Sequence, residues 1–412
     1  MRKQFILLFI IVLFINTGCK KNPTGKINLK ESLQKILDEN VPAYKAKFPG
    51  KPIGFGLYVK KAGSFGHGKS SQDVYVSSGF PQNYGENIQF RGASTTKSFT
   101  AAAILTLQQQ NKINLDDLIT DNIPGTNQPY IPATPEFAIP YKDKITIRLL
   151  LQHRAGVFDV TNDPVPAAAN APYAGKKYVD YIFAQQGDNH TFTIPELVNV
   201  IAKNQLSYFT PGTSFHYSNV GFHLLAVIIE RVSGKRYHQF LQDEFLTPLQ
   251  LNHTHFPYLG TDQSMPAPYV TSWLKTDAFY EIDKDNVSPI VADGNIITTP
   301  ADLANWANAL YATNTILNAD LHAQMITGVP TLEKNHVMYG LGTEMNPPDL
   351  GYGHNGAHPA YMTIMRYNPE TKASYVLVTN FLDATSLDAL NVQGAGLANI
   401  VREAIQAVKR SE

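Results

Sequence analysis

Strand-forming segments lie only at the two ends of this 412-residue chain, and helix-forming segments fill the part between them. Two short β-rich segments, at residues 53–61 and 72–80, flank a Gly/Ser/His stretch at 63–71 that favours a hairpin. Near the C-terminus, YGLGTEM, LGYGHNG and AYMTIMRYNPETKASYVLVTN are typical of consecutive antiparallel strands. The chain therefore predicts one antiparallel sheet built from both termini, with a mostly helical region inserted between them.

Several helices can be placed from their start signals. Three starts carry a capping residue: Thr146 in ITIRLLLQHRAG, Thr193 with Glu196 in TIPELVNVIAKN, and Thr299 with Pro300 in TTPADLANWANALY. We expect the first of these helices to end at Gly156. Further helices are expected over residues 29–48, 100–110, 220–234 and 391–407. These elements predict an α+β fold, an α/β/α sandwich in which helices flank the antiparallel sheet.

The order of these elements also divides the chain. We expect an α/β part at about residues 31–110 and 290–412, and a helical part at about 111–289. Residues 160–192 are rich in Pro, Ala and Asn and show no periodicity, which favours a long surface loop or cover.

The N-terminus has the composition of an export signal. Arg2 and Lys3 precede an apolar run from Phe5 to Ile15, which is too short to span a bilayer. Cys19, the only cysteine of the chain, follows this run and resembles the modified cysteine of a bacterial lipobox, although Asn16 stands where an aliphatic residue is usual.

We therefore expect a lipoprotein signal peptide at residues 1–18, a lipidated Cys19, a tether at 19–30 and one globular domain at 31–412. The protein would be exported and lipid-anchored to the bacterial cell envelope, on its periplasmic or cell-surface side. The alternative is an ordinary cleaved signal with an incidental cysteine. A single cysteine allows no disulfide within the chain.

Composition excludes several function classes. Lys and Arg number 34, as do Asp and Glu, and no long run of one sign occurs, so nucleic acid is not an expected partner. P-loop, dinucleotide and Gly-x-Ser-x-Gly patterns are absent from the sequence. His253 and His255 lack a nearby carboxylate or cysteine that would complete a zinc set, so neither a metal nor a cofactor is expected.

Ser94 and Lys97 are the first candidate catalytic pair. Residues three apart on a helix share a face, so the amine can reach the hydroxyl. Serine needs a base to become nucleophilic, and a desolvated lysine can be neutral enough to act as one. The pattern is weak alone, because Ser32/Lys35 and Ser272/Lys275 repeat it. A helix cap is the alternative role for Ser94.

Tyr217 and Asn219 form the second candidate pair. Among 21 tyrosines, only Tyr217 is followed by Asn at the second position. A phenol held near a lysine ammonium would have a lowered pKa and could act as a base, while the Asn amide could orient both lysine and substrate. The alternative is a buried tyrosine with a satisfied hydroxyl at a helix start.

His354 and Gly356 lead into a predicted strand. A strand edge beside a nucleophile can pair with an extended substrate, and its N–H groups can stabilise an oxyanion. Gly356 would allow close approach of the substrate. The alternative is a structural histidine near a turn.

These three motifs occur in the order Ser-x-x-Lys, Tyr-x-Asn, His-x-Gly, and here the sequence resembles the penicillin-recognising serine hydrolases. The resemblance is to the class C β-lactamase-like branch, with its D,D-peptidases, D-aminopeptidases and esterases, and it runs from about Ile53 to the C-terminal helix. ITIRLLLQHRAGV, FTPGTSFHYSN, GNIITTPADLANWANAL and YGLG look like further landmarks of that family. The resemblance implies a β-lactamase/transpeptidase-like fold.

The resemblance also implies a role for each residue. Ser94 would be the nucleophile, Lys97 its partner in proton transfer, and Tyr217 the general base for acylation and the acid toward the leaving group. Four residues would bind substrate: Asn219 its amide, His354 and Gly356 along the strand edge, and Ala357 with Ser94 through an oxyanion hole of backbone N–H groups. The reaction would pass through an acyl-serine without a metal.

Two departures from the family pattern bear on the substrate. His354 stands where many relatives carry Lys, so a permanent cation for a substrate carboxylate is missing. Ala360 stands where relatives often have Gly, and we expect its methyl group to narrow the groove beside the strand.

We expect a D,D-carboxypeptidase-like, D-aminopeptidase-like or β-lactamase-related envelope enzyme acting on a small peptide, ester or β-lactam-like substrate. The alternatives are a small-acyl esterase and a catalytically inactive scaffold that binds peptidoglycan or a partner.

Overall fold

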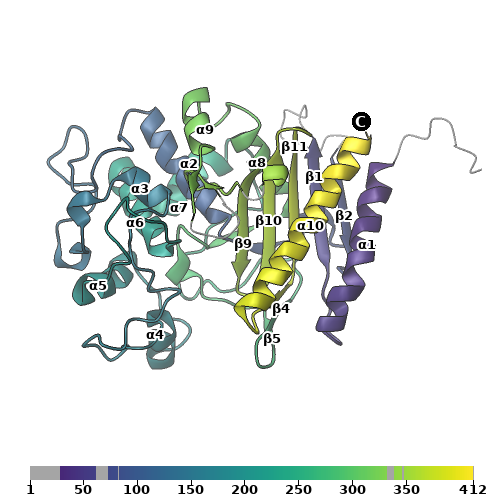
Figure 1. Cartoon of the computed structure of the whole chain (residues 1–412), viewed down its shortest axis with the longest axis horizontal. Coiled ribbons are helices and arrows are strands. Elements are labelled where there is room, and N and C mark those ends of the chain that lie inside the picture. The colour runs from purple at the N-terminus through teal and green to yellow at the C-terminus, as the bar shows by residue number, and fades with distance from the viewer. Residues whose placement is uncertain (1–27, 62–72, 82, 332–337, 346–347, 412) are drawn as a thin grey trace, which may run out of the picture.

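A five-stranded antiparallel sheet forms the middle layer of the molecule (Figure 1). The computed structural model describes residues 28–61, 73–81, 83–331, 338–345 and 348–411. The sheet has the order β2-β1-β11-β10-β9, with bounds β1 (Phe55–Lys61), β2 (Val74–Ser78), β9 (Tyr352–His358), β10 (Tyr361–Asn368) and β11 (Ala373–Thr379). β1 pairs with β11 from Phe55↔Thr379 to Lys61↔Ala373. The predicted sheet built from both termini is confirmed.

Helices cover both faces of this sheet. α1 (Leu29–Lys47) and α10 (Leu387–Ser411) lie side by side across one face, and α8 (Pro300–Tyr311) packs against β1, β10 and β11 on the other (Figure 1). Along β11, Leu377 belongs to the core under α1 and α10, whereas Val376 and Val378 belong to the core on the α8 side. A strand buried on both faces has a continuous apolar sequence, as SYVLV does here. The predicted sandwich is confirmed.

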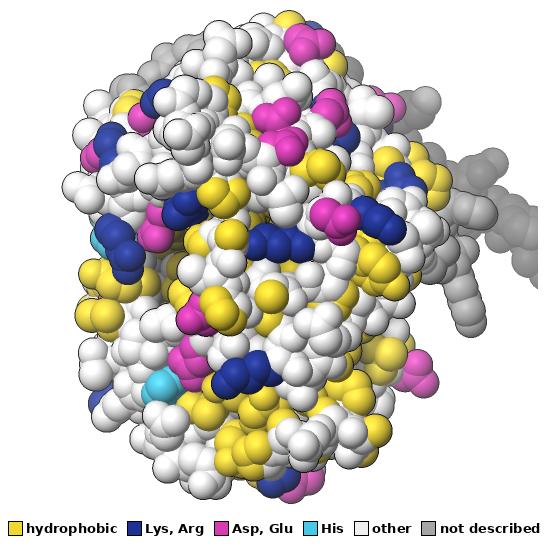
Figure 2. All heavy atoms as spheres, turned by 90° about the vertical axis from the view of Figure 1, so that its left-hand side faces the viewer, with side chains coloured by type: hydrophobic (Ala, Val, Ile, Leu, Met, Phe, Trp, Pro, Cys, Tyr) yellow, Lys and Arg dark blue, Asp and Glu magenta, His cyan; other side chains and the backbone are white. Residues whose placement is uncertain are grey.

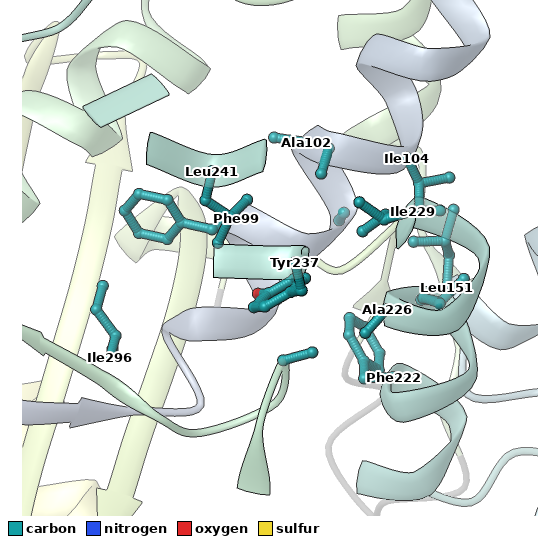
Figure 3. Close-up of a cluster of buried hydrophobic side chains, with 14 of the residues drawn as sticks. Phe99, Ala102, Ile104, Leu151, Phe222, Ala226, Ile229, Tyr237, Leu241 and Ile296 are labelled. Carbon is teal, nitrogen blue, oxygen red and sulfur yellow. The ribbon is translucent and has the colours of Figure 1, made fainter. Parts of the chain in front are cut away.

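The helical region lies beside the sheet and is joined to it through α2 (Thr96–Gln109). Every side chain of α2 from Thr96 to Leu107 is buried. Figure 3 shows the contacts of this helix: Phe99, Ala102 and Ile104 of α2 lie near Phe222, Ala226 and Ile229 of α6 and near Tyr237 and Leu241 of α7. The alanines of α2 are small, so neighbouring helices approach it closely.

The other helices and strands are short. The helical region contains α3 (Ile147–Leu151), α4 (Tyr178–Gln186), α5 (Ile194–Asn204), α6 (Asn219–Ser233) and α7 (Tyr237–Leu241), and α9 (Ala319–Met325) follows α8. Small sheets pair β3 (Phe90–Ala93) with β6 (Ile296–Thr298), β7 (Val329–Pro330) with β8 (Met338–Tyr339), and β4 (Ser272–Lys275) with β5 (Phe279–Ile282) and β12 (Phe381–Asp383).

The three predicted helix caps are present. The hydroxyls of Thr146, Thr193 and Thr299 each accept a backbone N–H three residues on, and Glu196 completes the capping box of α5. α3 is shorter than expected and ends at Leu151, with Gln152 as its C-cap, instead of at Gly156. The reason is a pair of positive φ angles, at His153 and Gly156, that turn the chain away from the helix.

Two further expectations differ from the structure. YGLGTEM is not a sheet strand: only Tyr339 belongs to β8, and a tight turn closed by Gly340 N–H and the Thr343 carbonyl follows. The segment 160–192 is not only a loop, since it contains α4.

The β4–β5 hairpin was not predicted, because its strands are only four residues long. The expected turn at 63–71 and Cys19 with its signal and tether up to residue 27 lie outside the described residues.

The described residues were also compared with the requirements of a membrane-spanning helix and of a metal site. None of the helices in the described ranges combines the length and the apolar character needed to cross a bilayer. The same residues contain no cluster of three or more His, Cys, Asp or Glu side chains suited to a metal ion.

Figure 2 shows the outer face of the helical region, where acidic and basic side chains are interspersed.

Thr193→Ala removes the hydroxyl of the α5 capping box, and we expect a loss of about 1 kcal/mol in the free energy of unfolding. Chemical denaturation followed by circular dichroism measures this loss. Thr193→Ser keeps the hydroxyl and should retain most of the wild-type stability. Equal stability of the Ala variant and the wild type would contradict the capping contribution.

Candidate active site

Ser94 lies in the turn between β3 and α2. The strand ends at Ala93, whose φ is +48°, and the helix begins at Thr96. Thr95, not Ser94, occupies the N-cap position, and its side chain makes no capping bond. The alternative role of Ser94 as a cap is therefore not seen. Its hydroxyl instead lies 3.3 Å from Lys97 Nζ.

The Lys97 amine lies at the centre of a small set of oxygen atoms. It donates to Asn219 Oδ1 at 2.8 Å and to the Asp293 carbonyl at 3.0 Å, and the Ser94 hydroxyl is its third neighbour. A neutral amine has two N–H donors and one lone pair. The two amide-type oxygens satisfy both donors, so the lone pair can point at Ser94 Oγ. In this arrangement Lys97 can accept the serine proton.

Burial makes Lys97 easier to deprotonate than an exposed lysine, although its protonated form still predominates at pH 7. Its side chain is 0% exposed, and burial lowers its pKa to about 8. The carboxylates of Asp293, 3.7 Å away, and of Asp159 act in the opposite direction and raise this pKa. The other oxygen of Asp293 is bonded to His223 Nε2 at 2.8 Å. Near neutral pH a measurable fraction of Lys97 is thus unprotonated.

Hydrogen bonds from both the backbone and the side-chain amide fix the position of Asn219. It is the first residue of α6, its backbone N–H donates to Asp159 at 2.9 Å, and its Nδ2 donates to the Thr161 hydroxyl at 3.1 Å. Its Oδ1 faces Lys97. One N–H and one lone pair of the amide remain, which is the capacity that substrate binding would need.

Tyr217 lies over the lysine, but its ionisation differs from the expectation. Lys97 Nζ is 4.6 Å from the centre of the phenol ring. Burial raises the pKa of Tyr217 well above 10, and a hydrogen bond with the Ser94 hydroxyl lowers it by less. The expected lowering of this pKa is therefore wrong. Around neutral pH the phenol keeps its proton and can serve as an acid, while Lys97 is the easier group to deprotonate.

His354 is buried and has both ring nitrogens bonded within the protein. Nδ1 donates to the Asn355 carbonyl at 2.6 Å, and Nε2 accepts the Tyr339 hydroxyl at 3.0 Å. Glu344 lies 3.5 Å from Nδ1. Burial nevertheless dominates and lowers the pKa of His354 to about 4. At neutral pH this position carries no positive charge.

Gly356 and Ala357 form the edge of β9 beside Ser94. A Cβ on Gly356 would lie 2.2 Å from the Gly92 carbonyl, so glycine is required for β3 to approach β9. The N–H groups of Gly353 and Asn355 bond to Glu344, on the side of β9 away from β10. Because alternate N–H groups of a strand point the same way, that of Ala357 also points to this side.

These groups share one cleft of about 1510 Å³. Its lining includes Ser94, Tyr217, Asn219, His354, Gly356 and Ala357, with Lys97 buried beneath them. One further wall is α4 with the residues before it, and another is the first half of α10. The segment 160–192 therefore forms part of the cleft wall.

Five further residues form hydrogen bonds with or beside the site residues and were not part of the sequence motifs. They are His153, Asp159, His223, Asp293 and Tyr339, and each contributes a single side chain with no motif spacing. Asp293 carried a signal of its own, since a lone carboxylate in the apolar stretch PIVADGNII suggests a buried charge. His153 and Tyr339 lie within the landmark stretches ITIRLLLQHRAGV and YGLG but were not singled out there.

Comparison with known proteins identifies the family. The Beta-lactamase family model matches residues 57–398. Since this range covers most of the chain and the β-lactamase/transpeptidase-like fold is present, the chain belongs to the Beta-lactamase family, and it is related to serine hydrolases.

Two relatives and two solved structures illustrate the similarity. Penicillin-binding protein 4* of Bacillus subtilis (strain 168) is 25% identical over 75% of this chain and 64% of its own length. Protein flp of Staphylococcus aureus (strain MW2) is 30% identical over 52% of this chain and 36% of its own. The chain thus matches less than two thirds of the length of these curated relatives.

A D-stereospecific amidohydrolase from Streptomyces sp. has a TM-score of 0.69 at 25% identity, over 90% of this chain and 99% of that one. D-amino acid amidase from Ochrobactrum anthropi SV3, complexed with L-phenylalanine amide, has a TM-score of 0.70 at 23% identity, over 93% and 99%. The second likeness supports the fold alone.

Asp293→Asn removes a carboxylate that raises the pKa of Lys97, so that pKa should fall below its value of about 8. If neutral Lys97 is the active form, the acidic limb of the pH profile of kcat/KM moves to lower pH. Asp320→Asn, on the exposed side of α9, is the control and should leave the limb in place. An unmoved limb in Asp293→Asn would argue against Lys97 as the base.

Proposed function

We propose that the protein is a serine hydrolase that cleaves an amide or ester bond through an acyl-Ser94 intermediate. The observation that carries this proposal is the contact of Ser94 Oγ with the buried, weakly basic amine of Lys97 at 3.3 Å. Tyr217, Asn219 and the end of β9 at Gly356 and Ala357 line the same cleft.

In acylation, neutral Lys97 takes the proton of Ser94 as Oγ bonds to the acyl carbon. The electron pair displaced from the carbonyl goes to its oxygen, which the N–H groups of Ser94 and Ala357 stabilise; one such donor contributes about 3 kcal/mol. When the tetrahedral species breaks down, the leaving nitrogen or oxygen takes a proton from Tyr217, and Lys97 reprotonates the phenolate. Water then releases the acyl group by the same steps in reverse.

The site suits a substrate whose leaving group carries no charge. His354 is neutral and already bonded to Tyr339 and Asn355, so it offers no fixed cation for a carboxylate. This supports a D-amino acid amide, whose leaving group carries no carboxylate, in line with the D-stereospecific amidohydrolase among the similar structures. A D,D-carboxypeptidase-like or β-lactamase-related activity would have to bind the carboxylate by other groups.

A small-acyl esterase is the second candidate. The same neutral His354 favours it, because simple esters lack a carboxylate. An inactive scaffold that binds peptidoglycan or a partner is less well supported, since the contacts among Ser94, Lys97 and Asn219 are those that acyl transfer requires.

Ser94→Ala should abolish labelling by a fluorophosphonate probe and turnover of every substrate. The panel is a D-amino acid amide, a D-Ala-D-Ala peptide, a chromogenic ester and a cephalosporin, tested on the purified full-length protein. We expect amide or ester turnover to exceed cephalosporin turnover. The matched control is Ser32→Ala, from another Ser-x-x-Lys pair, which should behave as wild type. Labelling that persists without Ser94 would refute this nucleophile.

We also propose that the protein is exported and anchored through a lipid on Cys19. The support is the N-terminal pattern of Arg2, Lys3, an apolar run and Cys19. Cys19→Ala should move the protein from the membrane fraction to the soluble fraction of fractionated cells, and metabolic labelling with a palmitate analogue should be lost. Membrane retention equal to wild type would contradict the anchor.

A further inference from the structure

Two loops that are far apart in the sequence pair with each other beside Tyr217. Residues 153–157 and 207–218 are linked by three backbone hydrogen bonds: Tyr208 N–H to the Gly156 carbonyl at 3.0 Å, Gly212 N–H to Arg154 at 2.9 Å, and His216 N–H to His153 at 3.0 Å. A Cβ on Gly156 would lie 2.1 Å from the Phe209 carbonyl, so only glycine permits this approach. The first loop therefore sets the path of the chain that leads to Tyr217.

His153 is bonded to both residues that flank Tyr217. Its carbonyl accepts the N–H of His216, and its Nδ1 accepts the N–H of Ser218 at 3.1 Å. The residues immediately before and after Tyr217 are thus bonded to one histidine. His153 has a φ of +56°, a conformation that non-glycine residues adopt rarely and that the surrounding contacts must maintain.

The imidazole of His153 also lies between two rings of the site. Its centre is 4.2 Å from that of Tyr217 and 4.8 Å from that of Tyr339. Tyr339 in turn donates to His354. One buried ring thereby contacts both the phenol that lies over Lys97 and the tyrosine that holds His354.

The hydrogen bond to Ser218 requires a neutral imidazole. Nδ1 can accept only when the ring proton is on Nε2, and a second proton would remove the acceptor. The side chain of His153 is 3% exposed, and burial, together with the nearby Lys97, lowers its pKa well below 6.5. Its Nε2 has no hydrogen-bond partner in the part of the chain that the structure describes. The ring therefore keeps one form over the pH range in which Lys97 titrates.

We propose that His153 is a positioning residue, which fixes the phenol of Tyr217 through the bonds to His216 and Ser218 and through ring contact. This inference rests on the proposed function, in which Tyr217 protonates the leaving group. No other side chain combines the two features: asparagine offers an acceptor and tolerates a positive φ but has no ring, and phenylalanine has a ring but no acceptor.

Two substitutions separate these features. His153→Phe keeps the ring and leaves the Ser218 N–H without its acceptor; we expect kcat to fall by about 10²-fold with KM little changed, the effect of a small misplacement. His153→Asn keeps an acceptor and should recover part of kcat. The pH limb set by Lys97 should stay in place in both variants. His238→Asn is the control, since His238 stacks on Tyr258 at 4.3 Å outside the cleft lining.

Thermal unfolding is measured on each variant, so that a loss of folded protein is separated from a loss of kcat. Wild-type kcat in His153→Phe would overturn the proposal. Failure of His153→Asn to exceed His153→Phe would also overturn it, because the acceptor would then have no role. A loss of activity that matches the unfolded fraction in both variants would count against it as well.

A spectroscopic measurement keeps this inference distinct from the proposed function. Carbon-13 at Cζ of tyrosine gives a signal for Tyr217, assigned with Tyr217→Phe. We expect this signal to shift or broaden in His153→Phe and to return toward its wild-type position in His153→Asn. An unchanged signal in both variants would refute the positioning role, even in an active enzyme. Absence of turnover in the wild type would refute the proposed function and leave the spectroscopic test valid.

Discussion

The rest of the site depends on the burial of one amine. Removing Lys97 from water is unfavourable unless its N–H groups find acceptors, and those acceptors are Asn219 Oδ1 and the Asp293 carbonyl. They come from the start of α6 and from the turn before β6, while Lys97 itself is on α2. The hydrogen bonds around Lys97 can therefore form only when α6 and the chain before β6 are both packed against α2.

The sequence was sufficient for the parts of the fold that depend on local rules. Capping at Thr146, Thr193 and Thr299 is a local hydrogen bond, and the termini could be joined in one sheet because their strands are long and apolar. The rules failed at YGLGTEM and at the β4–β5 hairpin. There the chain forms turns and strands of two to four residues, and long-range contacts outweigh propensity.

In the candidate site, too, the sequence motifs identified the main residues but not their environment. Ser94, Lys97, Tyr217, Asn219, His354, Gly356 and Ala357 converge as their motifs suggested, but their roles remain predictions. Their environment was not predictable, because it depends on burial and on lone residues brought from elsewhere. The phenol of Tyr217 has a raised pKa instead of a lowered one, and Gly356 accommodates β3. Asp293 and His153 lie far in sequence from Ser94, so no motif spacing linked them to the site.

Glu344 has a consequence for the length of chain that can lie along β9. Its backbone pairs with Gly353 and its carboxylate binds the N–H of Asn355. Both bonds occupy the strand edge that an extended peptide would use, and they leave Ala357 as the next outward-facing residue before β9 ends at His358. An extended peptide that pairs with β9 at Ala357 could therefore continue for only about one two-residue repeat before it reached Glu344. The part of this edge without a partner from Glu344 is therefore confined to the end of β9, beside Ser94 in the cleft.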